Sequence, residues 1–268
     1  MQGQVAVSGK VGNVPEMKRL PPAVLGLVIA NAALFIAGLV VPRGNEWLVE
    51  HGAFWFTANP NFASWQFVSY MFLHGGVGHI FFNLFALVSF GGILEQQWGT
   101  RRFLIFYLLC GVGAALVHNA VNGYHSGVLH EQLIAKGMTT DAINALLSTG
   151  HGSIPPGAEI KAALVALYQI YAAPMLGASG AIYGTLVAFG FLHPNAKLAL
   201  MFVPVPIAAK FFIPALLALD LLSGVTGISL FGGGIAHFAH LGGALIGLIL
   251  MLVWRHRTKP DDGTNATS

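Results

Sequence analysis

Residues 22–41 read PAVLGLVIANAALFIAGLVV, a run of twenty residues without a charged side chain. An α-helix of this length extends about 30 Å at about 1.5 Å per residue, which matches the hydrocarbon core of a lipid bilayer. A signal peptide would have a shorter apolar region and a cleavage site of small residues, so we expect an uncleaved membrane span. The rest of the chain is therefore expected to fold in and around a membrane.

The composition of the whole chain supports a membrane protein. Hydrophobic residues occupy 55% of the 268 positions and charged residues only 9%, whereas soluble domains have roughly 25% charged residues. The net charge of +3 is small and the basic residues are scattered, which argues against nucleic acid as a partner. The single cysteine, Cys110, lies in an apolar run and excludes a disulfide framework or a cysteine-based metal cluster. The expected partner is the lipid bilayer.

Five further apolar segments predict membrane helices, which gives six spans. They cover about 79–94, 102–121, 178–193, 207–228 and 234–254. Basic residues lie before the first span, between the second and third, between the fourth and fifth, and after the sixth: Lys10, Lys18, Arg19, Arg101, Arg102, Lys197, Lys210, Arg255, Arg257 and Lys259. Since basic residues gather on the cytoplasmic side, both termini are expected in the cytoplasm.

The expected fold is an all-α, multi-pass bundle of six helices with long external loops after the first and third helices. Residues 1–20 would form a cytoplasmic segment, 21–256 the membrane domain and 257–268 a cytoplasmic tail. Within the membrane domain, residues 122–176 form an external insertion. Its stretch TTDAINALLS predicts a short capped helix, and AEIKAALVALYQIY an interfacial helix that ends before Pro174. Such a chain suits the inner membrane of a bacterium, with an organelle membrane as the alternative.

One short segment combines a polar side chain with small residues. Residues 177–184 read GASGAIYG and contain Ser179. A helix from Ser179 to His193 is roughly 22 Å long, shorter than the bilayer core, so the serine is expected below the outer surface in a re-entrant loop. Alternatively, Gly180 and Gly184 form a helix-packing face on which serine is common. Taken alone, this segment favours packing.

The last predicted span carries a histidine at a matching depth. Residues 232–247 read GGGIAHFAHLGGALIG, and Gly243 and Gly247 repeat the four-residue glycine spacing. Two glycine faces allow the fourth and sixth helices to approach closely. Counted from the start of the helix, His240 lies about 9 Å down, near the depth expected for Ser179. A histidine that takes the serine proton makes the serine a nucleophile.

The third polar element begins the second span. Residues 74–85 read HGGVGHIFFNLF, and His79 and Asn83 are four residues apart, so they project from one helical face. With the backbone N–H of Ser179, these side chains can stabilise the oxyanion that develops in acyl transfer. Viewed alone, His79 would cap its helix and Asn83 would bond a neighbouring helix. Their joint placement at one membrane face favours the catalytic interpretation.

Together these segments resemble the rhomboid family of intramembrane serine proteases. The resemblance extends from about Trp65 to Gly247 and rests on HIFFN, GASG and AHLGG in that order. It implies a catalytic dyad of Ser179 and His240 in a six-helix core, with a water-accessible site that opens to the outer side. It also implies the following roles: an oxyanion hole of His79, Asn83 and Ser179, a Tyr183 ring packed on His240, and Gly177 as a supporting residue.

The activity implied by this resemblance is cleavage of transmembrane segments of membrane proteins near the outer face, without metal or cofactor. His237 lies three residues before His240 and is expected to face the same cavity as an accessory residue. No aspartate is expected to orient His240, and Asp220 is interpreted as a structural partner within the bundle. His74 and Glu95 resemble structural polar ties of the family, whereas Gln66 departs from the family's usual arginine.

Two alternatives remain open. An intramembrane metalloprotease would use the histidines at 74, 79, 237 and 240, but the sequence has no H-E-x-x-H pair and no carboxylate among them to act as a base. A catalytically inactive rhomboid-like protein that binds membrane proteins would usually lack the serine or the histidine, and this chain has both. A transporter is disfavoured because no inverted repeat is evident. Neither the substrate nor the oligomeric state is predicted.

Overall fold

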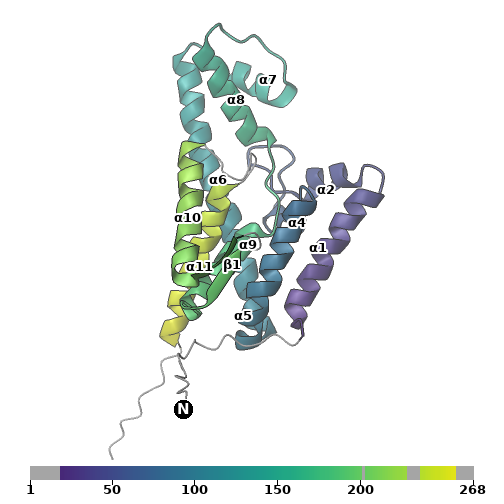
Figure 1. Ribbon diagram of the computed structural model, residues 1–268. Coiled ribbons are helices and arrows are strands. Elements are labelled where there is room, and N and C mark those ends of the chain that lie inside the picture. The colour runs from purple at the N-terminus through teal and green to yellow at the C-terminus, as the bar shows by residue number, and fades with distance from the viewer. Residues whose placement is uncertain (1–18, 201–202, 228–235, 258–268) are drawn as a thin grey trace, which may run out of the picture.

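The computed structural model describes residues 19–200, 203–227 and 236–257 (Figure 1). Its helices and strands are α1 (Pro22–Val40), α2 (Gly44–Gly52), α3 (Gln66–Ser69), α4 (Val77–Ala86), α5 (Gly92–Trp98), α6 (Thr100–Ala135), α7 (Thr140–Thr149), α8 (Ala158–Ala172), α9 (Ser179–Leu192), β1 (Lys197–Leu200), β2 (Val203–Ala208), α10 (Ala209–Thr226) and α11 (His237–Arg257). A 3₁₀ turn, Tyr70–Phe72, follows α3, and a π-helical stretch, Leu87–Gly91, joins α4 to α5. The expected cytoplasmic segments, 1–20 and 257–268, lie almost entirely outside the described residues and stay predictions.

The predicted helical membrane fold is confirmed. Five helical runs of the described chain are long and apolar enough to cross a bilayer: Pro22–Val40, Val77–Trp98, Thr100–Ala135, Ala209–Thr226 and His237–Trp254. The remaining predicted span corresponds to α9, which is apolar but has only 14 residues. The count of six spans therefore stays a prediction. Strands β1 and β2 pair as an antiparallel hairpin between α9 and α10, which the sequence analysis did not anticipate.

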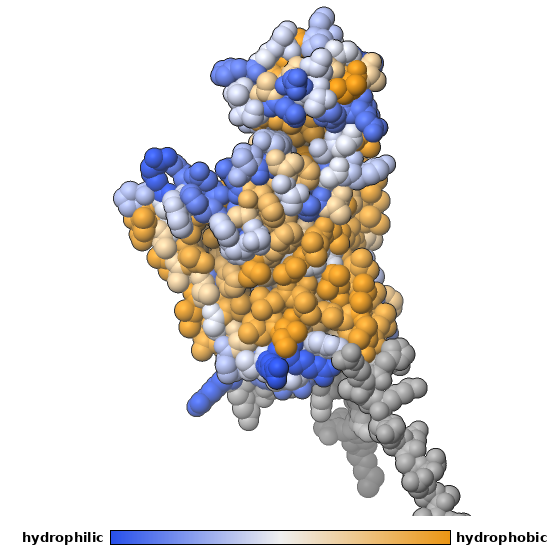
Figure 2. Space-filling model, turned by 180° about the vertical axis from the view of Figure 1, so that it is seen from behind, coloured by the Kyte–Doolittle hydropathy of each residue, from blue (hydrophilic) through white to orange (hydrophobic). Residues whose placement is uncertain are grey.

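The outer surface of the bundle suits contact with lipid. On the face that Figure 2 shows, a broad hydrophobic band crosses the helices, with hydrophilic residues gathered at its two ends. Large apolar side chains of α1 and α10 point outward, among them Ile29, Leu39, Phe211 and Leu222. Lipid tails satisfy such side chains, while the helices satisfy their own backbone groups internally. The chain is an integral membrane protein with several spans.

The third membrane helix is longer than expected. The sequence predicted its end near residue 121 and an external loop beyond, but α6 has 36 residues and continues to Ala135. At about 1.5 Å per residue it is about 54 Å long, well beyond the roughly 30 Å of a hydrocarbon core. In Figure 1, α6 projects past the other helices together with α7 and α8. The insertion is thus a helical structure, which we call the α6–α8 hairpin (residues 122–172).

The α6–α8 hairpin has a hydrophobic core of its own. Its buried members come from all three helices and their connections: Leu133, Met138, Ile143, Ile160, Leu164 and Leu167. Thr139 caps α7 as predicted, because its Oγ1 accepts a hydrogen bond from the Ala142 N–H. Lys136 Nζ lies 2.7 Å from Glu159 Oε2 at the surface. This hydrogen bond lowers the pKa of Glu159 and raises that of Lys136. The sequence did not predict this core, because the composition of the segment is largely polar.

Two polar side chains, Glu95 and Gln66, hold connecting segments of the chain in place. The Glu95 carboxylate accepts hydrogen bonds from the backbone N–H groups of Ala23 and Val24 at 2.8 Å each, which caps the start of α1. This contact agrees with the interpretation of Glu95 as a polar tie. In the first external connection, the buried Gln66 amide nitrogen donates to the carbonyls of His51 and Asn61. The glutamine therefore ties this loop although it departs from the family's usual residue.

Helices α9 and α11 touch through their glycines, as predicted. A Cβ added at Gly247 would lie 2.7 Å from the Gly184 Cα, and a Cβ at Gly243 would overlap the Gly180 carbonyl oxygen. Any side chain at these positions would push the two helices apart. Because α9 begins at Ser179 and α11 carries His240, this contact sets the distance between the predicted catalytic residues.

We expect Gly243→Ala to destabilise the folded bundle, since overpacking of a tight contact costs about 1–3 kcal/mol. The matched control is Gly26→Ala in α1, where an added Cβ meets no atom within 4 Å. Thermal unfolding in detergent would measure both. A clear fall in the melting temperature is expected for Gly243→Ala alone, and equal melting temperatures would contradict the described contact.

Candidate active site

Backbone hydrogen bonds position the segment that precedes Ser179. The N–H and C=O of Met175 each pair with Phe54 at 2.8 Å, and the Gly177 N–H donates to the Tyr70 carbonyl at 3.0 Å. Gly177 has a φ of +121°, and an added Cβ would lie 2.6 Å from His79 Nε2. Only glycine fits both the conformation and the space. The segment is thus held before α9 starts at Ser179.

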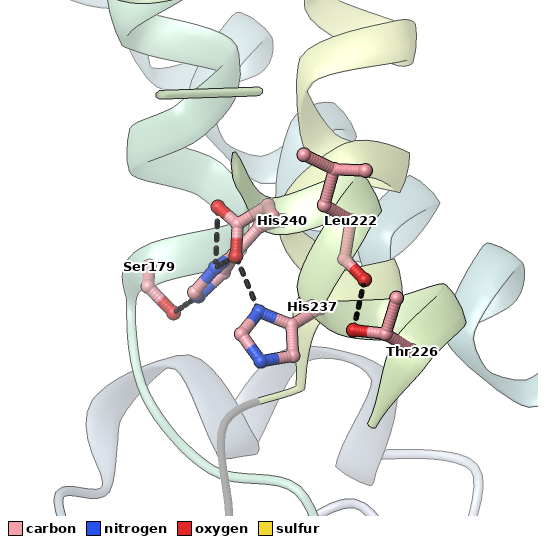
Figure 3. Close-up of polar contacts among 6 residues, drawn as sticks. Ser179, Leu222, Thr226, His237 and His240 are labelled. Atoms are coloured by element: carbon pink, nitrogen blue, oxygen red, sulfur yellow. Dashed lines mark hydrogen bonds and ion pairs between the residues drawn. The ribbon is translucent and has the colours of Figure 1, made fainter. Parts of the chain in front are cut away.

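Ser179 and His240 form a direct contact between α9 and α11. The Ser179 Oγ lies 2.8 Å from His240 Nε2, and Figure 3 shows the two side chains turned toward one another. The Tyr183 ring stacks on the His240 ring, with centroids 4.2 Å apart and an angle of 13° between planes. Tyr183 lies one helical turn after Ser179, so the same helix supplies the hydroxyl and the support for the imidazole. The structure brings these three predicted residues together.

An aspartate lies on the other side of the His240 ring, contrary to expectation. Both carboxylate oxygens of Asp220, on α10, lie 3.3 Å from His240 Nδ1. The His237 Nδ1 lies 2.5 Å from Asp220 Oδ1, and the Tyr183 side chain also hydrogen-bonds this carboxylate. The sequence predicted no aspartate beside His240, because the depth and rotation of α10 cannot be read from its hydrophobic pattern. Asp220 thus contacts three side chains of this site, those of Tyr183, His237 and His240.

His79 and Asn83 lie across the cavity on α4. The Asn83 Nδ2 donates to the His79 carbonyl at 2.9 Å, and His79 Nδ1 accepts a long hydrogen bond, 3.4 Å, from the Gly75 N–H. Both side chains line a cavity of about 750 Å³ that also contains Ser179 and His240. The predicted oxyanion groups and the Ser179–His240 pair therefore face one space.

His74 supports His79 through its ring. The two imidazoles meet edge to face with centroids 5.0 Å apart. Burial lowers the pKa of His74 to about 4, so this ring is neutral at neutral pH. Among the residues that the structure describes, neither His74 nitrogen has a hydrogen-bond partner. His74 therefore acts here through packing, and the expected polar tie is not observed.

The histidine arrangement favours a hydrogen-bond network over a metal centre. The ligand atoms of Asp220, His237 and His240 lie within 4.8 Å of one another. However, the 2.5 Å between His237 and Asp220 is a hydrogen-bond distance, whereas tetrahedral zinc with bonds of about 2.0–2.1 Å holds its ligands about 3.3 Å apart. His79 lines the cavity from α4, and His74 packs against its ring. The four histidines of the metalloprotease alternative thus belong to two separate groups.

Comparisons with known proteins agree with the motifs. A family model described as the Rhomboid domain matches residues 61–257. RHOMBOID-like protein 12, mitochondrial, of Arabidopsis thaliana is 28% identical over 230 residues, which cover 84% of this chain and 56% of the relative. The presenilin-associated rhomboid-like protein, mitochondrial, of Mus musculus is 28% identical over 244 residues, which cover 87% and 50%.

A third relative, Rhomboid protein 1, mitochondrial, of Saccharomyces cerevisiae, is 27% identical over 178 residues, which cover 66% of this chain and 38% of the relative. The chain thus spans about half the length, or less, of these curated relatives. All three are named as mitochondrial proteins, so the comparisons give no support to the expected bacterial inner membrane.

We expect a fluorophosphonate probe to label Ser179 in the detergent-solubilised protein, because His240 can accept its proton. Labelling should disappear in Ser179→Ala. It should slow at least about 10²-fold in His240→Ala, since general-base assistance contributes about 10²–10⁴-fold. Ser148→Ala in the exposed end of α7 serves as the control. Intact mass and peptide mapping would locate the label, and a label on any other serine would contradict the assignment.

Proposed function

The chain belongs to the rhomboid family, and we propose that it is an intramembrane serine endopeptidase that cleaves transmembrane segments of other membrane proteins. Rhomboid proteins act on membrane-protein substrates in a bilayer, which supports this class of activity. The observation that carries the proposal is the 2.8 Å contact of Ser179 Oγ with His240 Nε2 inside a cavity of a membrane-embedded bundle. We propose that neither a metal nor a cofactor takes part.

Ser179 acts as the nucleophile and His240 as the general base. The Ser179 Oγ attacks the carbonyl carbon of the scissile peptide bond while its proton passes to His240 Nε2. The C–N bond then breaks, the leaving amine takes that proton, and an acyl-enzyme ester remains on Ser179. A water molecule, deprotonated by His240, attacks the ester and releases the new carboxyl end.

Asp220 positions His240 for this proton transfer. A neutral imidazole carries one proton, and Asp220 favours its placement on Nδ1 because both carboxylate oxygens face that nitrogen. Nε2 then keeps the lone pair that must accept the Ser179 proton. Asp220 also stabilises the imidazolium that forms during the reaction. The site works as a Ser–His pair with a buried carboxylate behind it.

His79, Asn83 and the Ser179 backbone N–H would stabilise the oxyanion. In the present arrangement the Asn83 amide donates one hydrogen to the His79 carbonyl, and its second hydrogen is available to a bound substrate. Such donors, already held in a cavity, are most effective where charge develops in the transition state. The alternative function, an inactive rhomboid-like binding factor, is not favoured, because Ser179 and His240 are both present and in contact.

The cavity accepts an extended peptide, so the substrate helix must unwind first. A transmembrane helix hides its carbonyls in intrachain hydrogen bonds, and unpaired backbone groups are costly in lipid. The small residues around Ser179, including Gly177 and Gly180, leave room for a small residue on the acyl side of the cleaved bond. We place the cleavage near the outer membrane face, on the side where the α6–α8 hairpin projects.

We expect Asp220→Asn to lower kcat by about 10²-fold or more, with little change in KM, because the imidazole tautomer is no longer fixed. Ser223→Ala, another buried polar position of α10, is the control for packing of this helix. Cleavage of a single-span substrate in proteoliposomes would measure both constants, beside the melting temperature. Full activity of a folded Asp220→Asn protein would refute the positioning role.

We also expect substrates to be selected by helix stability. Glycine and proline weaken a helix by about 1 and 3 kcal/mol relative to alanine. Replacing such a residue near the cleavage site by leucine, with the scissile pair kept, should lower kcat/KM in proteoliposomes. A leucine substitution at the far end of the same span is the control. An unchanged rate across several substrates would show that unwinding does not limit selection.

A further inference from the structure

A second cavity adjoins the catalytic one and has no part in the mechanism above. It has a volume of about 570 Å³ and lies between α6, from His118 to Leu129, and α8, from Ala166 to Ile170. Pro174, Met175 and Ala236 line both cavities. The two cavities therefore adjoin, so a polypeptide bound at Ser179 would lie next to the second one, which we call the hairpin cavity.

The walls of the hairpin cavity are held in place by structure on both sides. The α6–α8 hairpin has its own buried core, which fixes α8 against the extension of α6. At the bottom, the backbone of Met175 pairs with Phe54 in both directions. The cavity is therefore preformed, and a ligand does not need to order its walls.

The depth of the hairpin cavity suits a chain that leaves the membrane. His118 lies 18 residues after the start of α6, or about 27 Å along the helix. The other α6 residues of the cavity lie further along, whereas Pro174, Met175 and Ala236 lie beside the catalytic cavity. The level of His118 is the edge of a hydrocarbon core about 30 Å thick. Figure 1 shows the hairpin beyond the ends of α1 and α4. The occupant is thus expected at the membrane surface and outside it, rather than among lipid tails.

The chemistry of the walls favours an uncharged peptide. No Asp, Glu, Lys or Arg is among the described residues that line the cavity, whose polar groups are amides, imidazoles and a phenol. The Asn122 Nδ2 lies 3.1 Å from His118 Nε2 and donates to it, which leaves the proton of the neutral ring on Nδ1. That Nδ1 is buried and has no partner in the described part of the chain. Because that Nδ1 is not accessible from the cavity, hydrogen bonds to a peptide backbone would come from the amides of Asn122 and Gln169.

We propose that the hairpin cavity is a binding site for the uncharged stretch of substrate polypeptide that flanks the scissile bond on the hairpin side of the membrane. The proposal rests on the proposed protease function, and it gives the insertion a role. The position of the hairpin cavity beside the catalytic cavity selects the substrate as the occupant. The uncharged walls select its composition, because a charged side chain would lose hydration there without gaining a partner.

The test introduces a large side chain into the hairpin cavity from α8. Ala166 is half-buried in the cavity wall, whereas its neighbour Val165 is exposed and does not line the cavity. We compare Ala166→Trp with Val165→Trp as the matched control, and with Gln169→Trp as a second blocking variant at an exposed position of the wall. Each protein is assayed in proteoliposomes on three single-span substrates: one with an uncharged flank, one with glutamates in the flank, and one with the flank removed.

The wild-type protein and Val165→Trp should cleave the substrate with the uncharged flank best. Ala166→Trp and Gln169→Trp should raise KM for that substrate by about tenfold with kcat unchanged, as expected when a contact made equally in ground and transition states is lost. On the substrate without a flank, all four proteins should be equal. Fluorophosphonate labelling of Ser179 should also be the same, which separates a failure of this proposal from a failure of the protease assignment.

Three results would overturn the proposal. The first is equal cleavage by the wild-type protein of the uncharged and glutamate-bearing flanks, as a lipid occupant would give. The second is an unchanged KM in both blocking variants. The third is a loss in these variants that is as large for the substrate without a flank, since that would show a general distortion of the catalytic cavity.

Discussion

The contact between the glycines of α9 and α11 is the constraint on which the rest of the site depends. Gly180 meets Gly243 and Gly184 meets Gly247 without intervening side chains. Ser179 begins one of these helices, and His240 lies one turn from the start of the other. The backbone contact therefore fixes the 2.8 Å between Ser179 Oγ and His240 Nε2 more rigidly than the side chains alone could.

The different lengths of α9 and α6 leave room for the catalytic cavity and the hairpin cavity. At 14 residues, α9 is about 21 Å long, while α6 is about 54 Å long. The short helix leaves irregular backbone at membrane depth, which is tolerated beside a water-filled cavity. The long helix carries the hairpin above the same point. The catalytic cavity and the hairpin cavity thus adjoin where α9 begins at Ser179, beside the part of α6 that continues to Ala135.

The sequence predicted the membrane helices and the residues of the Ser179 site, because both leave local signals: hydropathy for the spans, and polar residues at helical spacing for the site. It did not predict the position of Asp220, since a single carboxylate on an apolar helix says nothing of its rotation toward α11. It missed the continuation of α6, whose polar face conceals the leucines that pack on α8. It also missed β1 and β2, which are short and pair with each other between α9 and α10.

Catalysis and packing cannot be separated at Asp220. A carboxylate inside a membrane bundle is costly unless donors compensate it, and this one accepts hydrogen bonds from His237, His240 and Tyr183. These donors come from α9 and α11, whereas Asp220 belongs to α10, much of which faces lipid. The same contacts that orient the His240 imidazole therefore hold α10 against the bundle. His237 compensates the Asp220 carboxylate from a second side, so His240 is not its only imidazole partner.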